Sequence, residues 1–122
     1  MIDHLSLGVR DLAASRRFYD AALAPLGYRC LSEDPTSLGY GRDTAVLWLL
    51  ASDQPVAADP RSGLHVCFKA HDPAGVDAFH AAALAHGGRD HGAPGPRPDY
   101  GPTYYAAFVT DPDGYRLEAH AG

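Results

Sequence analysis

Three side chains in the sequence could together bind a metal ion: His4, His65 and Glu118. Each stands in a short stretch where apolar and polar residues alternate, which is typical of a β-strand with one buried face. Two imidazoles and one carboxylate hold a divalent ion and leave coordination positions free for a substrate. This ligand set suits Fe, Mn, Zn or Ni, and the sequence does not choose among them. We therefore predict one divalent metal ion, provided that folding brings the three side chains together.

An internal repeat relates the two histidines. When the chain is slid against itself by 61 residues, the coinciding pairs include His4 and His65, Asp11 and Asp72, Phe18 and Phe79, and Gly27 and Gly88. The repeat divides the single domain into module one (1–51), a linker (52–62) and module two (63–122). We expect the two modules to have the same local structure.

Each module is predicted to contain one strand, one helix and three further strands. In module one these are His4–Val9, the helix Leu12–Leu26, and the strands Tyr28–Ser32, Leu38–Gly41 and Ala45–Leu50. In module two they are Leu64–Lys69, the helix Pro73–His86, a short strand near Gly88–Gly92, and the strands Tyr104–Thr110 and Tyr115–His120. The Pro- and Gly-rich stretch His91–Gly101 is predicted to be a loop. This order predicts an α+β fold, with two βαβββ modules whose mixed sheets curl around one cleft.

Strand alternation places four residues in a predicted substrate pocket: Trp48, Tyr104, Ser6 and Cys67. The repeat matches Trp48 to Glu118, so the indole is either a wall for an apolar substrate or part of the core. Cys67 is either a reactive thiol or a small buried hydrophobe. No catalytic residue can be assigned from the sequence.

The predicted turn Thr110–Gly114 sets the register of the last two strands. Counting back across it places Ala106 beside Glu118 and Tyr104 on the same face. A small side chain beside a metal ligand would leave room for a substrate. The other histidines are predicted to lie at the surface; they are His71, His80, His86, His91 and His120.

Composition excludes several classes of protein. Ten Lys and Arg residues against fifteen Asp and Glu give a net charge of −5, which argues against binding to nucleic acid. The longest apolar run, Ala45–Ala51, is far below the roughly 20 residues that cross a bilayer. The first residues do not have the pattern of a signal peptide, and two cysteines provide no disulfide framework, so we predict a reducing cytoplasm. Exposed sheet edges predict a homodimer.

The repeat, the two histidines and the ending Asp111-Pro-Asp-Gly-Tyr-Arg-Leu-Glu118 resemble the vicinal oxygen chelate superfamily. This group contains glyoxalase I, extradiol dioxygenases, and fosfomycin- and bleomycin-resistance proteins. The resemblance implies that His4, His65 and Glu118 are the metal ligands. It also implies that a substrate binds the metal through two neighbouring oxygens.

One position departs from the glyoxalase pattern. Members of the glyoxalase type usually have a carboxylate or amide where this chain has Trp48, and an indole can neither bind the metal nor accept a proton. The pattern of three metal ligands, without a fourth at Trp48, is therefore closer to the dioxygenase and fosfomycin-resistance branches. The leading hypothesis is a small metalloenzyme of dioxygenase, lyase or transferase type. The alternative is a non-catalytic protein that sequesters a drug or metabolite in the same cleft.

Overall fold

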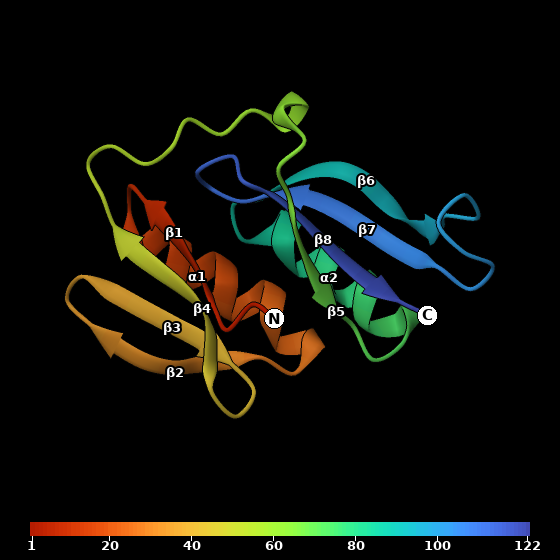
Figure 1. Cartoon of the computed structure of the whole chain (residues 1–122), viewed down its shortest axis with the longest axis horizontal. Helices are drawn as coiled ribbons and strands as arrows, with labels where there is room; N and C mark the ends of the chain where they lie inside the picture. Colours follow the sequence, from red (N-terminus) through yellow and green to blue (C-terminus); the bar gives the residue numbers. More distant parts are fainter.

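The computed structural model describes all 122 residues and contains two similar modules (Figure 1). Module one contains β1 (Leu5–Val9), α1 (Leu12–Leu23), a 3₁₀ turn (Ala24–Leu26), β2 (Arg29–Asp34), β3 (Ser37–Gly41) and β4 (Ala45–Ala51). Module two contains β5 (Val66–Lys69), α2 (Pro73–Ala85), β6 (Arg89–Pro96), β7 (Tyr105–Thr110) and β8 (Arg116–Ala121). A second 3₁₀ turn (Pro60–Ser62) precedes β5. The predicted βαβββ order and α+β class are confirmed.

The two modules form two four-stranded sheets with the same topology. The strand order is β1-β4-β3-β2 in sheet A and β5-β8-β7-β6 in sheet B. In each sheet the first pair of strands is parallel and the other pairs are antiparallel. Each sheet is therefore mixed, and each has its first strand at an edge.

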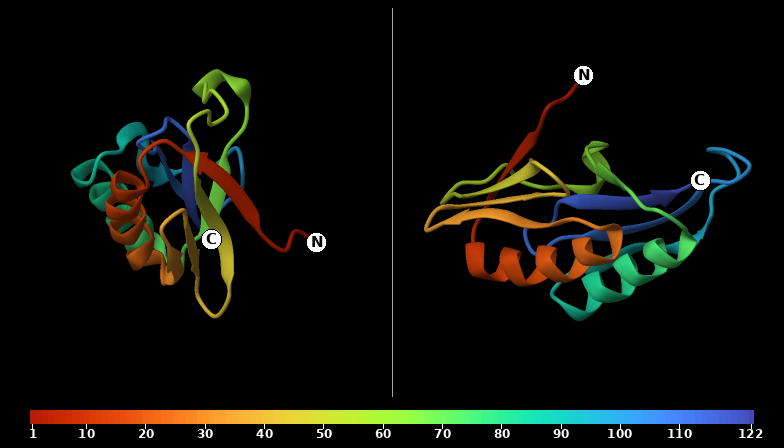
Figure 2. Two further views of the ribbon diagram at one scale, coloured as in Figure 1. Left: turned by 90° about the vertical axis from the view of Figure 1, so that its left-hand side faces the viewer. Right: turned by 90° about the horizontal axis from the view of Figure 1, so that it is seen from below.

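Both helices lie on the same side of the sheets and pack against each other, as the right-hand view in Figure 2 shows. The core between helices and sheets contains Phe18 and Phe79 from the helices and Leu49 and Leu117 from the sheets, all fully buried. Because strand side chains alternate, the residues between these core positions point to the opposite side. We call this side the open face of each sheet. The N-terminus projects from the open side, away from the helices (Figure 2).

The helix ends follow local chemistry. The carboxylates of Asp11 and Asp72 accept hydrogen bonds from the backbone N–H of Ala14 and Gly75, as expected of N-caps. The first helix is shorter than predicted because its last residues form a 3₁₀ turn that contains Pro25, which has no N–H to donate.

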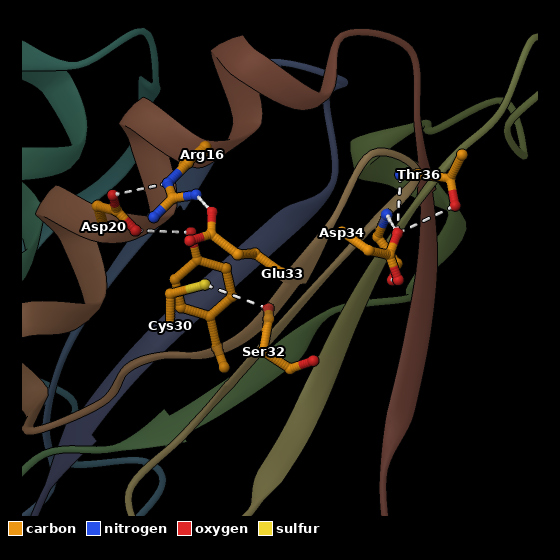
Figure 3. Close-up of polar contacts among 9 residues, drawn as sticks. Arg16, Asp20, Cys30, Ser32, Glu33, Asp34 and Thr36 are labelled. Atoms are coloured by element: carbon orange, nitrogen blue, oxygen red, sulfur yellow. Dashed lines mark hydrogen bonds and ion pairs between the residues drawn. The ribbon is translucent and has the colours of Figure 1, made fainter.

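The Arg16 side chain ties α1 to the hairpin of β2 and β3 (Figure 3). Its guanidinium pairs with Glu33 in β2 and lies 3.5 Å from Asp20. The Tyr40 hydroxyl in β3 donates to the Asp20 carboxylate at 2.7 Å. These contacts hold α1 against β2 and β3 and do not involve the open face of sheet A.

One element and one register differ from the prediction. The stretch predicted to be a loop, His91–Gly101, is a strand as far as Pro96, because β6 is an edge strand and tolerates prolines and bulges. In β7 the prediction that Ala106 lies beside Glu118 is wrong: Ala106 pairs with His120, and Phe108 pairs with Glu118.

The turn between β7 and β8 explains this difference in register. The backbone N–H of Asp111 donates to the Tyr115 carbonyl at 2.9 Å, so the strands close one position later than predicted. The Asp111 carboxylate also accepts from the N–H groups of Asp113 and Tyr115 at 2.9 and 2.8 Å. The turn is therefore held by a side chain, whose role the hairpin count did not include.

No helix in the structure has the length and apolar character needed to cross a bilayer.

Candidate functional site

The centre of the open face of sheet B is the carboxylate of Glu118, whose side chain is only 4% exposed. Its Oε1 lies 3.0 Å from His65 Nε2. Its Oε2 accepts a hydrogen bond of 2.6 Å from the hydroxyl of Tyr104. Burying a carboxylate costs free energy unless its oxygens are paired, and here both oxygens have a partner. The arrangement brings together three of the residues predicted for the site.

Burial and the neighbouring carboxylate change the acidity of two groups on this face. The pKa of the Tyr104 hydroxyl is raised, first by burial and then by its hydrogen bond to Glu118, so the hydroxyl stays a donor. Although part of the Cys67 side chain is exposed, desolvation and the charge of Glu118 raise the pKa of its thiol to about 12. Near neutral pH the sulfur is therefore a thiol, which argues against a nucleophilic role.

The third predicted ligand, His4, lies just before β1 and does not join this pair within the chain. Its side chain is about half exposed, and Nδ1 lies 2.6 Å from the Asp3 carboxylate. No three His, Cys, Asp or Glu side chains of one chain lie close enough to hold a metal ion together. One chain thus supplies the pair His65 and Glu118, with His4 at a separate place.

The open face of sheet A carries an apolar patch around Trp48. Ser6 in β1 and Gly39 in β3 are its strand neighbours. A Cβ on Gly39 would lie 2.8 Å from the indole, so the ring packs directly against the glycine. Val46 and Leu50, on either side along β4, are each about 40% exposed. The indole is thus half-buried on the open face and not part of the main core.

A groove of about 420 Å³ separates the edges of the two sheets. The groove is lined by β1, β5, the linker and the start of β8, including Ser6, Gly8, His65 and Tyr115. The Tyr115 hydroxyl donates to the Gly8 carbonyl at 2.7 Å and so joins the modules at one end of the groove. His65 therefore lies between the Glu118 carboxylate and this groove.

Two residues of the site, His120 and Phe108, were not predicted to belong to it. His120 was placed at the surface, yet its ring stacks on Tyr104 with centroids 3.6 Å apart, and its Nε2 is buried without a partner. Burial and the charge of Lys69 lower the pKa of this imidazole. Phe108 lies against the His65 ring, with centroids 6.0 Å apart. Alternation with Glu118 on β8 was the signal that could have placed His120 on the open face.

Two mixed sheets of this topology, with a histidine and a glutamate on an open face, define a protein of the paired βαβββ class. The family model described as Glyoxalase/Bleomycin resistance protein/Dioxygenase superfamily matches residues 1–119. The chain therefore belongs to this superfamily, which is also called the vicinal oxygen chelate superfamily.

Individual relatives agree with this assignment. An uncharacterized protein of Bacillus subtilis, YqjT, is 30% identical, and the match covers 94% of each chain. The crystal structure of a glyoxalase/bleomycin resistance protein from Albidiferax ferrireducens is 33% identical with a TM-score of 0.84, covering 96% of this chain and 95% of the other. The fosfomycin resistance protein FosX of Mesorhizobium loti has a TM-score of 0.70 at 19% identity, covering 98% and 89%, and shows the shared fold alone.

Proposed function

We propose that this protein is a small metal-dependent enzyme acting on a substrate with two neighbouring oxygens, with His65, Glu118 and His4 as metal ligands. The observation that carries the proposal is the buried carboxylate of Glu118, with His65 Nε2 3.0 Å from its Oε1. Two adjacent ligands that each bind one octahedral ion at about 2.1 Å, at a right angle, are about 3.0 Å apart. The separation of this pair therefore fits a divalent ion.

The neighbours of the carboxylate support the same proposal. Tyr104 pairs with Oε2, which leaves His65 Nε2 as the hydrogen-bonding neighbour of Oε1. Imidazole nitrogen and carboxylate oxygen suit Fe, Mn, Zn or Ni. When bound, the ion would supply Lewis-acid chemistry to the substrate oxygens. Tyr104 would orient the carboxylate, and Phe108 would keep water from one side of the His65 ring.

The third ligand, in this proposal, comes from a second copy of the chain in a homodimer. His4 stands on the open side with its side chain half exposed, and the apolar patch around Trp48 is uncovered. If sheet A of one copy faces sheet B of the other, the patch is covered and His4 approaches Glu118. Each site would then contain residues from both chains, with Trp48 as a wall of the substrate pocket.

Proton abstraction of the glyoxalase type is disfavoured in this proposal because Trp48 has no basic lone pair. We propose a dioxygenase-, lyase- or transferase-type reaction instead. A second candidate function is non-catalytic binding of a flat drug or metabolite. It is favoured by the half-buried indole, which is braced against Gly39 and could stack on a ring.

Mixing two variants tests both the ligands and the dimer. We expect His4→Ala and Glu118→Ala each to lose metal as purified homodimers. After the two are unfolded and refolded together, heterodimers would contain one intact site, made of His4 from one chain and Glu118 from the other. Elemental analysis of the isolated heterodimer should then give about half of the wild-type metal content.

Refolded wild-type protein and each variant refolded alone are the controls. A heterodimer without metal would contradict the shared site, and retention of metal by the Glu118→Ala homodimer would contradict the ligand set. If the wild type binds metal but converts no substrate with vicinal oxygens, the binding-protein alternative replaces the enzyme.

A further inference from the structure

Arg116 stands on the open face of sheet B without a polar partner. It is the first residue of β8 and lies two positions before Glu118, so the two side chains point to the same side of the sheet. The guanidinium makes no hydrogen bond or ion pair with any residue, and its Nε is buried. A guanidinium has five N–H donors, and leaving buried donors unpaired is costly. The structure therefore contains donors that no part of this chain satisfies.

The aromatic ring of Phe108 holds this side chain in place. The Arg116 guanidinium carbon lies 4.7 Å from the ring centroid, and that of Arg97 lies 5.7 Å from it. Arg97 already donates to the carbonyls of Ala93 and Gly95 at 2.8 and 2.9 Å. Arg97 is thus fixed by the backbone, whereas the donors of Arg116 remain available to a ligand. Stacking on an aromatic ring fixes the plane of a guanidinium without using its donors.

The surroundings of Arg116 favour an anion. Glu118 is the only carboxylate on the open-face side of β8, and it is already paired with His65 and Tyr104. The guanidinium groups of Arg97 and Arg116 both lie over the ring of Phe108. This concentrates positive charge at one place in a chain whose overall charge is −5. Planar guanidinium donors match carboxylate and phosphate oxygens in pairs.

We infer that Arg116 binds an oxyanion group of the substrate: a carboxylate, phosphonate or phosphate. The inference rests on the proposed function, because it places this group beside the proposed metal. The Arg116 guanidinium lies over Phe108, and Phe108 is the cross-strand partner of Glu118, so the oxyanion would lie on the same face, close to Glu118. The substrate would be a small anion, held at one end by Arg116 and at the other by the proposed metal site.

The test uses benzoate and phenylphosphonate as probes and benzamide as the neutral match. Binding is measured by NMR on the full-length protein, once with Zn(II) and once after chelator treatment. We expect both anions, and not benzamide, to shift the Nε–Hε signal of Arg116. Arg116→Met keeps an unbranched chain over Phe108 and should weaken anion binding about ten-fold or more, because it removes charge-assisted hydrogen bonds. Arg17→Met on α1 removes the same charge elsewhere and should leave binding unchanged.

The relative affinities of the two probes distinguish a carboxylate site from a phosphonate or phosphate site. Equal anion binding by Arg116→Met and the wild type overturns the inference, and so does an Arg116 signal that neither anion shifts. The signal of the wild type decides the question even if the variant does not fold. Metal content is measured on the same samples. Protein that binds the anions but takes up no Zn(II) when the ion is supplied would overturn the proposed function alone. Protein that takes up Zn(II) but binds neither anion would overturn this inference alone.

Discussion

Trp48 and Glu118 occupy equivalent positions in the two sheets. Trp48 pairs with Ser6 across the parallel strands of sheet A, and Glu118 pairs with Cys67 across those of sheet B. Ser6 and Cys67 are themselves 61 residues apart, the shift that relates His4 to His65. The repeat thus places an indole in one module where the other has a buried carboxylate. The two sheets therefore have the same backbone topology, but one offers an apolar ring to the proposed site and the other offers a carboxylate.

Restoring a carboxylate at this equivalent position should strengthen the metal site. We expect Trp48→Glu to tighten binding of Zn(II) several-fold, since it would add a fourth, anionic ligand. Competition with a chromogenic chelator measures the affinity, and Trp48→Leu is the control, because it has a similar size to Glu and no atom that can bind the metal. Equal affinity of Trp48→Glu and Trp48→Leu would argue that this position lies away from the metal.

The hydroxyl of Tyr104 should act on the metal through Glu118. Removing it in Tyr104→Phe frees Oε2 and loosens the orientation of the carboxylate, so we expect metal affinity to fall about ten-fold or more. Tyr105→Phe is a matched control, because the Tyr105 hydroxyl bonds Asp77 on α2 at 2.7 Å instead. Metal competition assays on both variants test this. An equal effect of both changes would indicate a general loss of stability.

Asp111 should make the stability of the fold depend on pH. Burial raises the pKa of its carboxyl to about 6, despite hydrogen bonds from the Tyr19 hydroxyl and two backbone N–H groups. Between about pH 4 and 6 the folded state therefore keeps a proton that the unfolded state releases. The free energy of unfolding falls as pH rises through this window, by up to about 3 kcal/mol.

Asp111→Asn lacks this titration and tests the prediction. Urea unfolding of both proteins from pH 4 to 7 should show the wild type losing stability relative to the variant as pH increases. The difference between the two proteins isolates Asp111, because their other groups titrate alike. A difference that does not change with pH would mean that the buried carboxyl ionises normally.

Gly39 should be required for the packing of Trp48. A methyl group at this position would lie 2.8 Å from the indole, so Gly39→Ala should destabilise the protein by about 1–3 kcal/mol. Thermal unfolding measures the loss. The double variant Gly39→Ala with Trp48→Leu removes the clash and should recover most of it. If the single variant is as stable as the wild type, the indole does not lie over Gly39 in solution.

The sequence was sufficient to predict the order of the elements in each module, because it follows from local alternation and from the repeat. It did not predict the continuation of β6 to Pro96 or the place of His120 on the open face. Phe108 was missed because the register of β7 depends on the Asp111 side chain, which holds the turn one position later than a simple hairpin count predicts. The separation of His4 from Glu118 could not be predicted, since alternation assigns a face to each residue and does not set how the two sheets are arranged.

Metal content per chain is the most direct test of the proposed site. Elemental analysis of protein purified without chelator, and after saturation with Zn(II), should give one ion per chain for the wild type. Glu118→Gln keeps the size of the side chain and removes its charge, and we expect it to retain much less than one ion. Glu33→Gln on β2 is the control and should bind as the wild type does. Equal metal content in Glu118→Gln and the wild type would contradict the account.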